Sequence, residues 1–141
     1  MTIERFEDLQ VWKDARVLTQ QVYQISNGDR FSRDFRLKDQ VRGSSISIMS
    51  NIAEGFEYYS VKQFQRYLSF AKGSAGELRS QFYVAFDAKY ITKEKLQSLI
   101  SEAESISKQC AGFMKYLDSY DNDNYAGEPE DFLTIINYDR A

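Results

Sequence analysis

The chain contains no histidine, one cysteine and one proline among its 141 residues. The missing histidines exclude Ser-His-Asp and Cys-His nucleophile systems and the Glu-x-x-His pairs of di-iron bundles. Ordinary zinc sites need three or four nitrogen or sulfur ligands, which one cysteine cannot supply. We therefore expect a protein that is not an enzyme and that holds no metal and no cofactor. An all-carboxylate magnesium site, which has no sequence signature, stays open as the alternative.

Long apolar runs are also missing. No stretch approaches the roughly 18 residues that a membrane span needs, and the first residues, MTIERFEDLQ, lack the basic and apolar regions of a secretory signal. We expect a cytoplasmic protein with no membrane partner. The single cysteine, Cys110, lies in an apolar helical stripe and is expected to be a buried small hydrophobe.

So few prolines and glycines interrupt the chain that long helices are expected. Apolar residues recur at spacings of three and four, most regularly from Leu96 to Leu117. Ser60 and Thr92 are suitable N-caps for the last two long helices. The pattern predicts an all-α, up-and-down antiparallel four-helix bundle over residues 1–120, with helices at about 8–25, 32–54, 60–89 and 93–120.

The second predicted helix has two apolar faces, which indicates a packing partner beyond the intrachain core. We expect an interface between copies of the chain at Ile46, Met49, Ala53, Phe56, Tyr58 and Tyr59. Small residues gather around Gly43 in this helix and around Gly73 in the third. Antiparallel pairing is expected to bring the two clusters together so that the backbones approach closely. The alternative is that both clusters face solvent.

The net charge of −3 conceals an asymmetry, because residues 1–120 carry +2 and residues 121–141 carry −5. Within the bundle, positive charge is concentrated on the second and third helices. The candidate nucleic-acid-binding residues are Arg33, Arg36, Arg42, Lys62, Arg66 and Arg79. One copy of such a face would bind phosphate backbones weakly, and a ring of copies more strongly. The alternative is a solvated face with local ion pairs.

Residues 121–141 form an acidic tail that begins with polar residues and ends on Phe132, Leu133, Ile135 and Ile136. We expect a flexible linker followed by a short apolar docking segment. The segment is predicted to dock on the bundle or on a neighbouring subunit, which would place the acidic stretch over the basic helices.

Four motifs occur in order between residues 6 and 78: FEDLQVWKDA at 6–15, L-x-x-Q-V-R-x-S-x-x-S-I at 37–48, SNIAEG at 50–55 and LSFAKGSAGEL at 68–78. They resemble the four-helix-bundle family of 23S rRNA intervening-sequence proteins, which includes the accessory variability protein of diversity-generating retroelements. The resemblance implies a cytoplasmic bacterial protein that forms a homopentamer. In the retroelement branch it also implies binding of RNA or DNA and partnership with a reverse transcriptase.

Two polar residues of these motifs, Asn51 and Glu54, are expected to be structural. They lie near the end of the second helix, where Glu54 could pair with Lys62 or accept hydrogen bonds from the first turn of the third helix. Three functions therefore remain open. The first is a homo-oligomeric, non-catalytic accessory protein that binds nucleic acid, and the second is a protein-interaction or scaffold module that does not. The third is a small-molecule-binding bundle, which only the aromatic content supports.

Overall fold

The computed structural model describes residues 2–120 and 129–138, and every regular element within these ranges is a helix. The bounds are η1 Phe6–Asp8, α1 Gln10–Ser26, η2 Phe31–Arg33, α2 Phe35–Glu57, α3 Val61–Asp87, α4 Lys93–Asp118 and α5 Pro129–Ile136. No helix in the described part of the chain combines the length and the apolar character that crossing a membrane requires.

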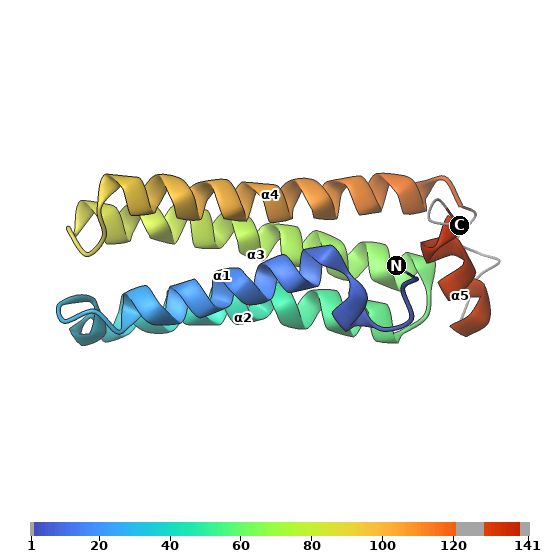
Figure 1. Cartoon of the computed structure of the whole chain (residues 1–141), viewed down its shortest axis with the longest axis horizontal. Helices are drawn as coiled ribbons and strands as arrows, with labels where there is room; N and C mark the ends of the chain where they lie inside the picture. The colour runs from blue at the N-terminus through green and yellow to red at the C-terminus, as the bar shows by residue number, and fades with distance from the viewer. Residues whose placement is uncertain (1, 121–128, 139–141) are drawn as a thin grey trace.

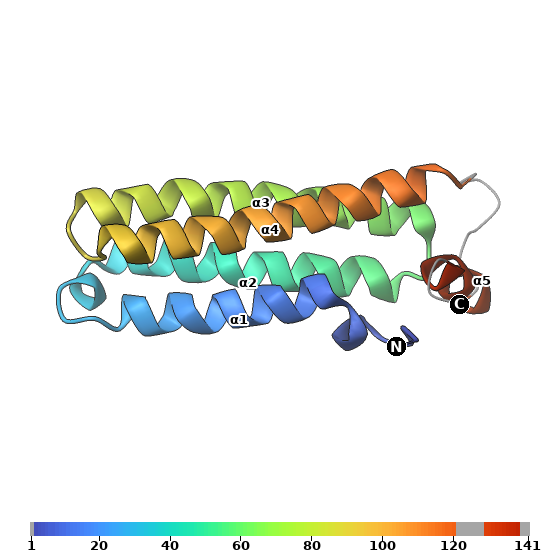
Figure 2. The same cartoon turned by 45° about the horizontal axis from the view of Figure 1, so that its top comes forward.

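The long helices α1 to α4 lie side by side, each antiparallel to the next along the chain (Figure 1). Contact is most extensive between α2 and α3 and between α3 and α4, and α1 joins them mainly through α2 (Figure 2). The predicted all-helical bundle is confirmed. A fifth helix, α5, contains the apolar segment that was expected to dock, and it lies across the end of the bundle that holds the N-terminus and the α2–α3 turn (Figure 1). Most of the acidic stretch expected to lie over the basic helices falls outside the described residues.

One apolar core runs along the bundle. The stripe predicted on α4 is buried from Leu96 to Leu117, except that Phe113 is only partly covered. Cys110 is fully buried, as expected. Each large apolar side chain of such a core contributes about 1.5–3 kcal/mol when it leaves water.

Side chains and backbone geometry define the helix ends. Asp34, Ser60 and Thr92 each accept a hydrogen bond from the backbone N–H three residues later, so both predicted caps are confirmed and α2 gains a third. α3 ends in a Schellman motif, in which Lys89 has a φ of 65° and Tyr90 N–H donates to the Ala85 carbonyl. The chain therefore reverses before α4 on a left-handed residue that is not glycine.

The close approach between α2 and α3 occurs at Gly55, and the expectation that placed it at Gly43 and Gly73 is wrong. A β-carbon on Gly55 would lie 2.5 Å from Tyr67 Cβ. A β-carbon on Gly43 or Gly73 would meet nothing within 4 Å. The two mid-helix glycines face open space, as the alternative interpretation held.

The register of the α2–α3 hairpin explains this difference. The hydroxyls of Ser47 and Ser74 are hydrogen-bonded at 2.9 Å, so these two residues lie at the same level. In an antiparallel pair, Gly43 is then level with a residue about one turn beyond Ser74, and Gly73 is level with a residue near Ser47. The hairpin turn is therefore centred later in the chain than a pairing of Gly43 with Gly73 requires.

Candidate interaction surfaces

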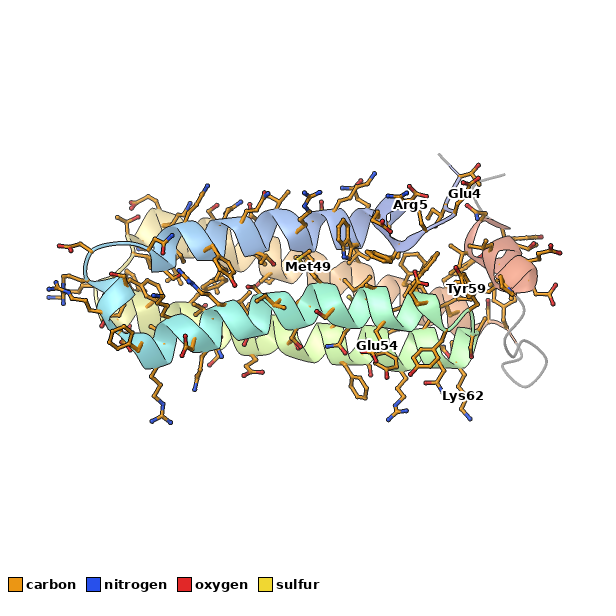
Figure 3. The ribbon with its side chains drawn as sticks, turned by 90° about the horizontal axis from the view of Figure 1, so that it is seen from below. Glu4, Arg5, Met49, Glu54, Tyr59 and Lys62 are labelled. Atoms are coloured by element: carbon orange, nitrogen blue, oxygen red, sulfur yellow. The ribbon has the colours of Figure 1, made fainter. Side chains whose placement is uncertain are left out.

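Two groups of exposed cations lie at opposite ends of the α2–α3 pair. Arg33 and Arg36 lie where α2 begins, whereas Lys62 and Arg66 lie in the first turns of α3. Figure 3 shows Lys62 at the end of the bundle that also carries α5. None of the four forms an ion pair with a described residue. The 23 residues of α2 correspond to about 35 Å of helix. One copy of the chain therefore does not gather these cations into one site.

Arg42 is engaged within the bundle. Its Nε donates to Ser26 Oγ and its Nη2 donates to Asn27 Oδ1, both at 2.8 Å. Its guanidinium also lies over the Tyr23 ring, 4.4 Å from the ring centroid. Arg42 thus ties the end of α1 to α2, and these contacts leave it poorly placed for a phosphate.

Arg79 is likewise used inside the chain. Its Nη2 lies 3.2 Å from Glu104 Oε1, and the pair links α3 to α4. The Nε of Arg79 is buried and has no partner among the described residues. Two of the six predicted phosphate ligands are therefore occupied by intrachain contacts.

An exposed aromatic cluster lies close to the second pair of cations. Tyr67 stacks on Tyr58 with ring centroids 5.5 Å apart, and Phe70 lies edge-on to Tyr67 at 5.6 Å. The Arg66 guanidinium lies over Phe70 at 5.4 Å. The Tyr67 hydroxyl donates to Glu54 at 3.3 Å. A hydrogen bond with Tyr58, loss of hydration and the Glu54 carboxylate raise the pKa of Tyr67 to about 12.

Sequence reasoning named Tyr58 and Arg66 as candidate interaction residues but missed Tyr67 and Phe70, which complete the cluster. One signal was available. Arg66 and Phe70 are four residues apart on α3, a spacing at which side chains on a helix meet.

The predicted subunit-interface residues divide into three environments. Ile46 and Tyr58 are 43% and 48% exposed, whereas Met49, Ala53 and Tyr59 are half-buried. The expectation that Phe56 is exposed is wrong, because this side chain is fully buried. The reason is that α2 extends to Glu57, beyond its predicted end, and this last turn directs Phe56 into the core.

The two motif residues expected to be structural form local contacts. Asn51 Nδ2 donates to the Ser47 carbonyl at 2.8 Å and to Ser47 Oγ at 3.0 Å, which connects it to the hydroxyl pair between α2 and α3. Glu54 accepts from Tyr67, and the structure places no ion pair between Glu54 and Lys62.

Groups suited to chemistry are scarce in the described ranges. These residues include no group of three or more His, Cys, Asp and Glu side chains that could hold a metal ion. Burial raises the pKa of the Cys110 thiol to about 12, which disfavours the reactive thiolate. A groove of about 330 Å³ lies between α3 and α4. Four of its lining residues are apolar or aromatic and four are polar: Tyr83, Phe86, Leu96 and Ile100, and Lys93, Gln97, Ser101 and Glu104.

Similarity to known proteins agrees with this helical architecture. A solved structure of a protein of unknown function of the S23 ribosomal protein family, from Bacteroides thetaiotaomicron, has a TM-score of 0.68 at 22% identity. The match covers 74% of this chain and 98% of that chain, and it shows a shared fold. No relative is found among curated protein sequences. Residues 7–112 match the 23S rRNA-intervening sequence protein family. The chain belongs to this family of 23S rRNA-intervening sequence proteins.

Proposed function

We propose that this protein is a non-catalytic, self-assembling helical bundle that binds nucleic acid through cations gathered from several copies. One observation carries the proposal. The outward side of the α2–α3 pair presents exposed apolar side chains, Ile46 and Phe70, between two groups of cations that form no ion pair with described residues. The two cation groups are Arg33 with Arg36, and Lys62 with Arg66.

Association of copies through the apolar middle of this face brings the cations of several copies to one nucleic acid. Gly43 and Gly73 face open space there, so a neighbouring helix can approach the backbone closely. Each added copy brings four more unpaired cations, and multivalent contact raises affinity without any new type of interaction. We propose a homopentamer in the cytoplasm, as the sequence resemblance implies.

The first experiment measures particle mass by light scattering, since multivalency depends on assembly. The second measures binding of structured RNA and of duplex DNA by fluorescence anisotropy at several salt concentrations. We expect affinity to fall steeply with salt, with a slope that grows by roughly 0.9 for each phosphate neutralised. Absence of binding at low salt would contradict the nucleic-acid part of the proposal.

Matched variants separate specific cations from total charge. The double variant Arg33→Ala with Arg36→Ala, and the corresponding Lys62→Ala with Arg66→Ala, should each weaken binding at least tenfold. The control removes two exposed lysines of α4, Lys108 and Lys115, and changes the net charge equally. Equal weakening by all three double variants would argue against a nucleic-acid surface on α2 and α3.

A protein-interaction scaffold without nucleic-acid binding is the second candidate. It is favoured by the intrachain contacts of Arg42 and Arg79, which reduce the free positive charge of the face. In that function the same apolar side chains would bind a protein partner, such as a reverse transcriptase. A stable oligomer that binds no RNA or DNA, yet binds such a partner, would support it.

A further inference from the structure

The end of the bundle that carries the α2–α3 turn forms an aromatic socket, which we define as Phe56, Tyr59 and Phe64. Phe132 of α5 fills it, with ring centroids 5.3 Å from Phe56, 5.8 Å from Tyr59 and 5.7 Å from Phe64. All three contacts are edge-to-face, the arrangement that aromatic rings prefer. Phe132 is only 1% exposed. Figure 3 shows Tyr59 beside α5 at this end of the bundle.

Other contacts orient α5 over the socket. Ile135 and Ile136 are buried with Phe132, so one face of this short helix is apolar at spacings of three and four. The Tyr116 hydroxyl donates to the Ile135 carbonyl. Just after α5, Asn137 Oδ1 accepts from Ile3 N–H at 2.7 Å and Asn137 Nδ2 donates to the Ile3 carbonyl at 2.8 Å. α5 is therefore bound by specific side-chain contacts to several parts of the chain.

Two features indicate that α5 binds the bundle as a separate peptide would, although the chain connects the two. It has eight residues, and isolated helices shorter than about 12 residues are marginal in water, so its helical form depends on docking. It also lies outside residues 7–112, which match the family. When α5 leaves the socket, the aromatic rings lose their cover, which favours occupation by the nearest helix of the same sequence.

The tether is long enough to serve two copies. Ten residues, 119–128, connect α4 to α5, whereas three residues connect α2 to α3 and five connect α3 to α4. Ten residues span at most about 35 Å, which is comparable to the length of α2. The tether therefore reaches any socket that lies within this span, including one on a neighbouring copy, and a socket held within reach binds α5 at a raised effective concentration.

We propose that, in the assembled protein, α5 of one copy occupies the aromatic socket of a second copy. The inference rests on the self-assembly proposed above. Exchange of an identical element keeps every contact of Phe132, Ile135 and Asn137 and changes only the path of the connection. Contacts that close one end of a single bundle then also hold two subunits together. The site is completed by a residue, Phe132, of the partner copy.

Photo-crosslinking of the full chain tests this exchange. Leu133, half-buried on α5, is replaced by the photoreactive residue benzoylphenylalanine, and the irradiated protein is separated under denaturing conditions. We expect an adduct of twice the chain mass that maps to the peptide containing residues 56–64. The adduct should be lost when Tyr59→Gly is added. Tyr59 has a φ of 50°, which suits glycine, so this variant removes the ring without straining the backbone.

A control replaces another exposed tyrosine, Tyr83, which lies near the end of α3 that is far from the socket and is not among the expected interface residues. Tyr83→Ala should leave the double-mass adduct in place. One contrary outcome is that light scattering shows a multimer while crosslinks form only within single chains. These adducts of single-chain mass would overturn the exchange and leave self-assembly intact. Such adducts in a monomeric particle would overturn both.

Discussion

Gly55 of α2 lies directly against Tyr67 of α3, so close that a β-carbon on Gly55 would be 2.5 Å from Tyr67 Cβ and 3.3 Å from Phe64 Cδ1. The contact holds Tyr67 in place, where it stacks on Tyr58 and donates to Glu54. The exposed aromatic cluster can therefore take this position only because Gly55 has no side chain.

We expect Gly55→Ala to destabilise the protein by about 2 kcal/mol, because overpacking outweighs the gain in helix propensity. Urea unfolding followed by circular dichroism measures the change. Gly112→Ala, on α4, is the matched control. It lies within a helix, has open space around it and is away from the proposed assembly face, so it should stabilise the protein by up to about 1 kcal/mol. Equal effects of the two substitutions would contradict the close approach at Gly55.

Lys89→Gly should stabilise the protein by about 1 kcal/mol. The φ of Lys89 is 65°, and glycine adopts this conformation without the steric cost that a β-carbon imposes. Thermal unfolding compares it with Lys89→Ala, which removes the same charge and keeps the β-carbon. An equal gain in stability in both variants would show that the effect comes from removal of the charge and not from the backbone conformation.

Arg42→Ala should lower the free energy of unfolding by about 2 kcal/mol, since hydrogen bonds from a charged donor contribute about 1.5–3 kcal/mol. The substitution would weaken the junction of α1 and α2, where Arg42 donates hydrogen bonds to Ser26 and Asn27. Arg36→Ala, at an exposed position, should change stability by less than about 0.5 kcal/mol. RNA affinity should respond in the opposite order, with the larger loss in Arg36→Ala.

The Cys110 thiol should resist modification in the native protein. At pH 8, a chromogenic disulfide reagent is expected to react only after denaturant is added, because the thiol is buried and its pKa is raised to about 12. Rapid reaction in native buffer would contradict its burial.

The same pKa shift predicts a pH dependence of stability. The unfolded chain loses the Cys110 proton near the ordinary pKa of 9.0, and the folded chain loses it near 12. The thiol's contribution is therefore fully present below pH 9 and is lost as the pH rises toward 12. The difference in unfolding free energy between the wild type and Cys110→Ala should shrink over this range, and a constant difference would contradict the shift.

Local pattern was sufficient for much of the fold. The spacing of three and four from Leu96 to Leu117 predicted α4, and Ser60 and Thr92 marked helix starts, because caps and amphipathic periodicity depend on neighbours a few residues away. The absence of histidine likewise excluded histidine-dependent metal sites and nucleophile systems from the sequence alone.

The sequence alone therefore determined the helical class, the buried thiol and the presence of cations on α2 and α3. Only the tertiary structure decided which cations are free, because the partners of Arg42 and Arg79 come from other helices. It also decided that Gly55, and not Gly43, is the point of close approach, since hairpin register depends on the turn and on the Ser47–Ser74 pair. Phe56 is buried in contact with Phe132, which lies 76 positions later in the chain. Periodicity along one helix does not encode such a contact.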